Sequence, residues 1–280
     1  MLDRFILKVE EGRKYILLVP ITFVITIILA FFNKFIGGNA LFLVAFVSLA
    51  LAYPITSFAR SMERKDIEEF NKSRNFFQRY EKELVVFLLM FCGVSLGFFA
   101  SIPFISDFSY QEAFAGPINE SVVAGKSIGG YVAQSDSVFP LIFMNNLKVT
   151  FLTFILSFLL YSGLIFILVW NASVIVYTLH SFGSYDKVLI MAISILPHGF
   201  LEIAGYIVAG LAGAILSFRL DNAYSSKFYK VSDEKGNIKI RPDRRNTFKK
   251  ILNKRFYVDL ILLVIISLVL VFVGALIEVL

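Results

Sequence analysis

The sequence predicts an all-α fold, a polytopic bundle of about seven transmembrane helices. Three observations predict it. Hydrophobic residues make up 58% of the 280 residues, and the chain contains 31 phenylalanines. Several apolar runs are long enough, at about 18 residues, to cross the hydrocarbon core as a helix. Basic residues gather between these runs. Soluble domains are nearer half apolar and rarely contain such runs, so the excess is lipid-facing surface.

The net charge of +6 is compatible with nucleic-acid binding, but the distribution of the basic residues argues against that class of protein. They lie between apolar runs, where the positive-inside rule places the bases of cytoplasmic loops. We therefore expect no nucleic-acid partner. The single cysteine, Cys92, lies within an apolar run and cannot form an intrachain disulfide.

Residues 1–83 are expected to form a first unit, which contains a charged amphipathic segment, a two-span hairpin and a charged loop. The two spans cover residues 15–32 and 41–58. The loop, residues 59–83, holds seven bases and six acids. Because the orientation rule counts bases, we expect this loop and the N-terminus in the cytoplasm. The paired acids of the loop are expected on a solvated helical face, Glu81 and Glu83 among them.

Residues 84–280 are expected to form a second unit, a membrane core of five spans. Its first span covers residues 84–103. Residues 104–139 follow, with four acids and one base, and this scarcity of bases places them outside the cytoplasm. At about 36 residues, this segment is long enough for a functional loop.

Residues 141–182 must fold back at least once, because a single helix of this length would measure about 60 Å. A turn at Ser162-Gly163 would give two spans, whereas a turn at Trp170–Ser173 would give one span and a half-helix. We expect the first division. This division gives an even number of crossings between residues 139 and 198. Residues 219–255, which contain twelve bases, then lie in the cytoplasm.

The sixth span is expected to begin at Pro197, since proline is favoured in the first turn of a helix. Residues 188–196 would form a short apolar helix that Pro197 breaks or kinks. Residues 198–218 would then cross the bilayer in about 31 Å. The last span would start at Phe256 and leave the C-terminus outside the cytoplasm.

Small residues recur at every fourth position of the predicted sixth span, at Gly205, Ala209 and Gly213. Small residues let transmembrane helices approach closely, because lipid provides no hydrophobic driving force between helices. We interpret these three residues as a packing face.

His198 and Glu202 are the main candidates for a functional site. They lie four residues apart, hence on one face of a helix, and an ionisable residue inside a spanning helix is costly and is a functional candidate by default. Either a structural hydrogen bond, between the two residues or to Asn171 or Asn145, or a direct functional role accounts for them. With His180, they would also form a ligand set suited to zinc, if the ends of the fifth and sixth spans converge.

Amide side chains within apolar runs are the second group of polar candidates. Asn145, Asn146 and Asn171 are expected to form interhelical hydrogen bonds, the usual role of amides in transmembrane bundles. The sequence contains no Walker A, dinucleotide-binding, HExxH, CxxC or GxSxG motif. These patterns favour a protein that is not an enzyme.

The ordered set Asn145-Asn146, Asn171 and Pro197-His198-Gly199-Phe200-Leu201-Glu202 resembles the stage II sporulation protein M family of integral membrane proteins. The P-H-G-x-x-E string, followed by a small-residue helix, is its sharpest part, and the likeness covers residues 84–280. Ala172 stands where the family has glycine after the asparagine. The resemblance implies a scaffold, since the sporulation member anchors a complex with two peptidoglycan-degrading enzymes.

We therefore expect a non-enzymatic scaffold in the cell membrane that recruits partners through residues 104–139 or the cytoplasmic loops. Two alternatives remain open. One is a transporter or channel with a polar site at His198 and Glu202, and the other is a zinc-dependent intramembrane hydrolase that also uses His180. Residues 219–255 are expected to contact anionic lipid, and the chain could form homo-oligomers.

Overall fold

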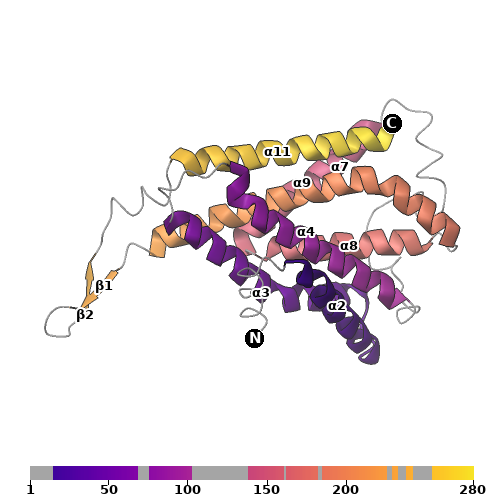
Figure 1. The fold of residues 1–280 in the computed structure, drawn as a ribbon, viewed down its shortest axis with the longest axis horizontal. Helices are drawn as coiled ribbons and strands as arrows, with labels where there is room; N and C mark the ends of the chain where they lie inside the picture. The colour runs from indigo at the N-terminus through magenta and orange to yellow at the C-terminus, as the bar shows by residue number, and fades with distance from the viewer. Residues whose placement is uncertain are drawn as a thin grey trace.

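The computed structural model describes residues 15–68, 76–102, 138–160, 162–181, 185–225, 229–232, 238–241 and 254–280. Over these residues the chain forms a bundle of helices that lie alongside one another (Figure 1). The helices are α2 (Leu18–Phe35, preceded by the 3₁₀ turn η1, Tyr15–Leu17), α3 (Ala40–Glu68), α4 (Phe76–Ser101), α7 (Val138–Leu160), α8 (Gly163–Ser181), α9 (Tyr185–Ser225) and α11 (Lys254–Val279). The predicted all-α membrane bundle is confirmed.

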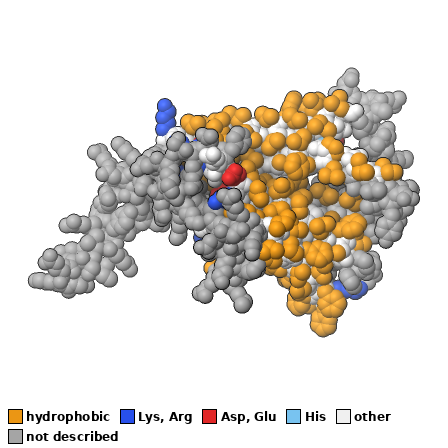
Figure 2. All heavy atoms as spheres, in the orientation of Figure 1, with side chains coloured by type: hydrophobic (Ala, Val, Ile, Leu, Met, Phe, Trp, Pro, Cys, Tyr) orange, Lys and Arg blue, Asp and Glu red, His pale blue; other side chains and the backbone are white. Residues whose placement is uncertain are grey.

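Six of these helices are long and apolar enough to cross a membrane, and α8 is the shorter, with an apolar stretch over Gly163–Val176. Hydrophobic side chains cover the broad face of the bundle in Figure 2, as lipid contact requires. The described part therefore has seven α-helices, of which six have the length and hydropathy of a membrane span.

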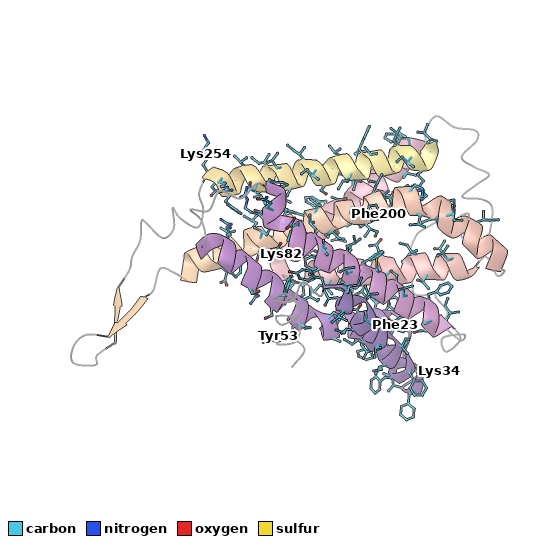
Figure 3. All side chains as sticks on the ribbon, in the orientation of Figure 1. Phe23, Lys34, Tyr53, Lys82, Phe200 and Lys254 are labelled. Carbon is cyan, nitrogen blue, oxygen red and sulfur yellow. The ribbon has the colours of Figure 1, made fainter. Side chains whose placement is uncertain are left out.

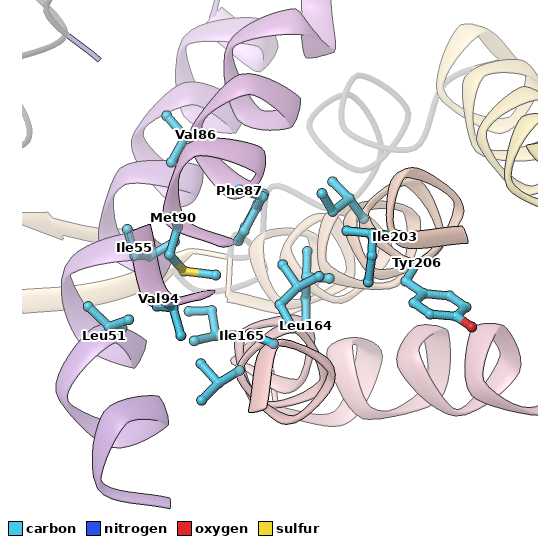
Figure 4. Close-up of a cluster of buried hydrophobic side chains, with 14 of the residues drawn as sticks. Leu51, Ile55, Val86, Phe87, Met90, Val94, Leu164, Ile165, Ile203 and Tyr206 are labelled. Atoms are coloured by element: carbon cyan, nitrogen blue, oxygen red, sulfur yellow. The ribbon is translucent and has the colours of Figure 1, made fainter. Parts of the chain in front are cut away.

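The short helix α8 lies in the interior of the bundle. Leu164, Ile165 and Leu168 are all 0% exposed. Figure 4 shows the first two beside side chains of α3, α4 and α9. A helix that is hydrophobic all round is a buried helix, and one surrounded by protein does not have to match the thickness of the lipid.

The turn between α7 and α8 falls at Ser162, so the predicted division at Ser162-Gly163 is confirmed. The alternative turn at Trp170–Ser173 is wrong, because those residues lie inside α8. Gly163 explains the position of the turn. A Cβ at this position would overlap the backbone of Leu156, so the chain reverses where no side chain is present.

Helix α9 is continuous from Tyr185 to Ser225, so the expectation that a helix starts at Pro197 is wrong. Pro197 lies inside the helix, and its side chain is exposed. Figure 1 shows α9 curving toward its N-terminal end. Proline is tolerated within transmembrane helices because neighbouring structure satisfies the freed backbone groups. At 41 residues and about 1.5 Å each, α9 exceeds the hydrocarbon thickness about twofold.

The predicted packing role of the small residues in α9 is confirmed, but three of its glycines pack against three different helices. Gly205 faces Val271 and Ser267 of α11, and the Ser267 hydroxyl donates to the Gly205 carbonyl oxygen at 2.9 Å. Gly210 faces Leu164 of α8, and Gly213 faces the backbone of Phe154 in α7. Successive small residues point in different directions around the helix axis, and here each one packs against a different neighbouring helix.

A second close contact joins α2 to α4. Gly93 and Gly97 form a small-xxx-small pair on α4, and a Cβ at either position would overlap the side chain of Thr22 or Thr26, respectively. Both threonines are buried, and their hydroxyls donate to backbone oxygens of their own helix. The hydroxyls are thereby satisfied without a partner from α4.

The charged segments between spans contain more regular structure than the sequence predicted. Helix α3 continues to Glu68 and α4 begins at Phe76. Within residues 219–255, α9 ends at Ser225 and is followed by an antiparallel pair, β1 (Tyr229–Ser232) and β2 (Ile238–Arg241). Residues 1–14 and 104–137, for which we predicted an amphipathic segment and an outer loop, lie outside the described residues.

The two charged segments meet at one end of the bundle. Figure 1 places the end of α3, the start of α4, the end of α9 and the start of α11 on the same side. In Figure 3, Lys254 lies toward that end and Lys34, in the last turn of α2, lies at the opposite end. The helices therefore alternate in direction as a multi-pass protein requires.

Charged side chains are buried at this end of the bundle. Arg79 of α4 forms a bidentate ion pair with Asp259 of α11, and the two side chains are only 7% and 4% exposed. The Tyr80 hydroxyl also donates to Asp259, at 3.3 Å. Glu83 is 5% exposed, so its expected position on a solvated face is wrong, whereas Glu81 is exposed as predicted.

Candidate functional site

A chain of hydrogen bonds between polar side chains joins α7 to α9 inside the bundle. The Tyr206 hydroxyl donates to Oδ1 of Asn146 at 3.0 Å. Nδ2 of Asn146 in turn donates to Oε1 of Glu202. Asn146 is 7% exposed and Tyr206 is 3% exposed. We call these three residues the polar network.

Helix geometry explains why these side chains meet. Glu202 and Tyr206 are four residues apart and share a face of α9. Asn146 lies on the buried face of α7 together with Thr150, whose hydroxyl donates to the Asn146 carbonyl oxygen at 2.7 Å. The Asn146 amide therefore contacts both Glu202 and Tyr206, which lie one helical turn apart on α9.

Helix α11 closes the third side of the polar network. A Cβ on Gly274 would lie 3.0 Å from Cγ of Glu202 and 3.3 Å from the His198 carbonyl oxygen. A larger residue at this position would require the neighbouring atoms of α9 to shift by a few tenths of an ångström, so glycine favours the close approach of the two helices. The α9 segment with the P-H-G-x-x-E string is thus packed directly against a glycine of the last helix.

Two further ionisable side chains lie next to the polar network. Glu278, near the end of α11, interacts electrostatically with both Glu202 and His198. His198 is half-buried, as are the two carboxylates.

The network satisfies the polar groups that it brings into the membrane. Both polar ends of the Asn146 side chain are hydrogen-bonded, one as donor and one as acceptor. An unpaired polar group in an apolar interior costs several kcal/mol, of the order of 2–7 by transfer scales. The arrangement can therefore hold α7 to α9, and the carboxylate of Glu202 gives it a titratable group.

Other residues singled out by the sequence lie away from the polar network. Asn145 is exposed, and Pro197 is exposed on α9. Asn171 donates from Nδ2 to the Ile167 carbonyl oxygen of its own helix at 2.8 Å. The structure therefore joins Asn146, rather than Asn145 or Asn171, to the acid of the P-H-G-x-x-E string.

Gly199, the glycine of this string, has one close neighbour. A Cβ there would lie 3.2 Å from Cγ2 of Ile195 on the same helix, a tight contact that a small shift of this half-buried side chain would relieve. We expect Gly199→Ala to leave stability unchanged or to raise it by up to about 1 kcal/mol, because alanine is the better helix former. Thermal unfolding of the purified full chain measures this, and a clear loss of stability would contradict it.

The residues predicted to bind zinc are only partly within the described structure. His198 lies thirteen residues, about 20 Å, along α9 from its start at Tyr185. His180 is the next-to-last residue of α8, and its side chain lies outside the described part. Among the described residues, no group of three or more His, Cys, Asp or Glu could hold a metal ion. The zinc site stays a prediction.

Sequence reasoning missed Tyr206, Gly274 and Glu278. A signal existed for Tyr206, which is a polar-tipped residue four positions after Glu202 within an apolar run. Gly274 and Glu278 are likewise four apart, near the end of the last span. Nothing in the sequence indicates that this pair packs against His198 and Glu202.

The fold and the network define a class of protein: a polytopic helical membrane protein whose bundle contains a hydrogen-bonded polar network near an ionisable cluster. The family model of stage II sporulation protein M matches residues 85–280, from within α4 to the end of the chain. The chain belongs to this family, and the resemblance seen in the sequence is confirmed. No curated protein and no solved structure matches it.

Proposed function

We propose that this protein is a non-enzymatic scaffold of the cell membrane that positions partner proteins. The observation that carries the proposal is the way in which Glu202 is held by two other helices. The carboxylate is bound by Asn146, and the α11 backbone at Gly274 packs against its side chain. Such contacts join three helices and give the polar groups a structural role. The family resemblance also supports a scaffold.

The proposed orientation has the N-terminus in the cytoplasm and the C-terminus outside. Its support is the position of the basic segments 59–83 and 219–255, whose flanking helix ends lie on one side of the bundle (Figure 1). In this orientation the basic segment 219–255 would lie at the inner leaflet, where anionic lipids attract it. Residues 104–139 would lie outside, available to partners on that side.

A transporter remains the second candidate because of a specific observation. His198, Glu202 and Glu278 bring three ionisable groups together near one end of the membrane span. Groups of this kind mark proton and ion pathways in membrane proteins. A proton pathway would require Glu202 to exchange protons, whereas a scaffold requires only that its side chain accept a hydrogen bond.

The substitution Glu202→Gln separates the two functions. It keeps an acceptor oxygen for Asn146 and removes the charge. For a scaffold, we expect proteoliposomes of the wild type and of Glu202→Gln to show the same proton flux as protein-free liposomes, measured with an internal pH-sensitive dye. A proton flux of the wild type that Glu202→Gln abolishes would overturn the scaffold in favour of transport.

A second measurement tests the scaffold directly. In the native membrane, solubilised in mild detergent, the chain should migrate in a complex well above the size of the same chain purified and reconstituted alone. Gly199→Ala, which leaves the network intact, should migrate like the wild type in both samples. A chain that migrates with the same size in both samples would contradict the scaffold.

A further inference from the structure

The exposed face of α7 carries a charge in the middle of a membrane span. Lys148 is the eleventh residue of the 23-residue helix, next to the midpoint, and its side chain is exposed. At 1.5 Å per residue, about 15 Å of helix separate it from the nearer end. Lysine is among the least favourable residues at the centre of a lipid-facing helix.

Lys148 does not belong to the polar network. Asn146, Thr150, Thr153 and Ser157 lie on the buried face of α7. Lys148 is two residues from Asn146, which places it on nearly the opposite side of the helix. It makes no hydrogen bond or ion pair with any residue that the structure describes.

A second polar side chain accompanies Lys148 on this face. Asn145 is also exposed and lies three residues earlier, so the two side chains are neighbours on the helix surface. Large apolar residues flank them: Leu141, Met144, Phe151 and Leu152, each between 48% and 70% exposed. The face thus combines an amide, a cation and an apolar surround, a pattern that suits a protein neighbour better than lipid.

We propose that this face of α7 is an intramembrane docking surface for a helix of another membrane protein that carries a carboxylate near the middle of its span. Charge complementarity identifies the occupant. A carboxylate neutralises the ammonium of Lys148, and the Asn145 amide can hydrogen-bond to the same partner. The proposal rests on the scaffold function and specifies the kind of partner that the scaffold holds.

A second copy of this chain offers no matching group. Among the described residues, the exposed carboxylates are Glu81 and Asp221, near the start of α4 and toward the end of α9. Both lie at the end of the bundle where the charged segments meet, far from the middle of a span. Glu202 is bound by Asn146 within its own bundle, and Glu278 lies at the end of α11, away from the middle of a span. Since no described residue supplies a carboxylate at the middle of a span, we assign it to a different protein.

The test uses the purified full chain in phosphatidylcholine vesicles and a labelled synthetic transmembrane peptide. The peptide is built of leucine and alanine with one glutamate at its centre, and matched peptides carry leucine or lysine there. We expect the glutamate peptide to bind about tenfold more tightly than the leucine peptide by energy transfer, a typical effect of one interhelical polar contact. Lys148→Met should remove that preference, and Lys148→Glu should transfer it to the lysine peptide.

Lys254→Met is the matched control, because Lys254 is exposed at the end of a helix, and it should keep the glutamate preference. Three results would overturn the docking surface. They are equal binding of all peptides, self-association of two labelled copies that Lys148→Met abolishes, and binding that depends on added anionic lipid. If one of these results occurs while the native complex is still observed, the docking surface is wrong but the scaffold proposal is not contradicted. If the chain migrates alone in native membranes, the scaffold proposal itself is wrong.

Discussion

Asp259→Ala is expected to lower the free energy of unfolding by about 3–5 kcal/mol, the cost of breaking a buried ion pair by removing one partner. The substitution leaves the guanidinium of Arg79 buried without its bidentate acceptor. It also removes the acceptor of the Tyr80 hydroxyl. Reversible unfolding of the full chain by sodium dodecyl sulfate in mixed micelles measures the effect.

The control for this prediction is Asp221→Ala, which removes an exposed carboxylate near the same end of the bundle and should have little effect. The double variant Arg79→Leu with Asp259→Leu should recover much of the loss, because an apolar pair of similar volume avoids the buried charge. A loss below about 1 kcal/mol for Asp259→Ala would show that the ion pair behaves like a surface pair.

The ion pair connects a residue outside the family-matching part of the chain to a residue within it. Arg79 lies before the part that matches the family, residues 85–280, and Asp259 lies within it. The pair therefore ties the start of α4 to the last helix of the family core. Loss of the pair should loosen the contact between α4 and α11 first, and hydrogen exchange at the starts of these two helices would report this.

Gly93→Ala is expected to displace α2 from α4 and to destabilise the bundle by about 1–3 kcal/mol, the usual range for overpacking. The added methyl group would overlap the side chain of Thr22 and lie 2.5 Å from the Val19 carbonyl oxygen. Backbone atoms cannot rotate away, so the helices must separate. The measurement is the same unfolding titration, supported by a cross-link between cysteines introduced on α2 and α4.

The neighbouring residue provides the control for Gly93→Ala. Cys92 is exposed, so Cys92→Ala adds no overlap and should unfold like the wild type. Gly97→Ala should resemble Gly93→Ala, because its methyl group would approach Thr26 to 2.6 Å. Equal stability of Gly93→Ala and Cys92→Ala would mean that α2 and α4 are less closely packed than the structure places them.

Part of the candidate site could be predicted from the sequence. The spacing of His198 and Glu202 placed both on one face of a helix, and the cost of charge in a membrane required partners for them. The sequence favoured Asn145 or Asn171 as a partner, and this expectation is wrong, because Asn146 binds Glu202. Adjacent residues point about 100° apart on a helix, and the orientation of α7 selects between them. That orientation depends on the packing of α9 and α11.

The expected helix start at Pro197 failed for a related reason. Proline is costly in the interior of a soluble helix, which led us to place it in a first turn. In the bundle, α9 accommodates Pro197 within a continuous helix, with the proline side chain exposed. The surroundings of a membrane helix, rather than its own sequence, determine whether a proline ends it.

By itself, the sequence determined the membrane class, the seven helices, the turn at Ser162-Gly163 and the family. These features depend on hydropathy and length along a single stretch of chain, because each spanning helix satisfies its own backbone hydrogen bonds. Only the tertiary structure decided the polar network, the Arg79–Asp259 ion pair and the exposure of Lys148. Those depend on contacts between residues far apart in the chain, and pairing of transmembrane helices rests on a few small or polar side chains.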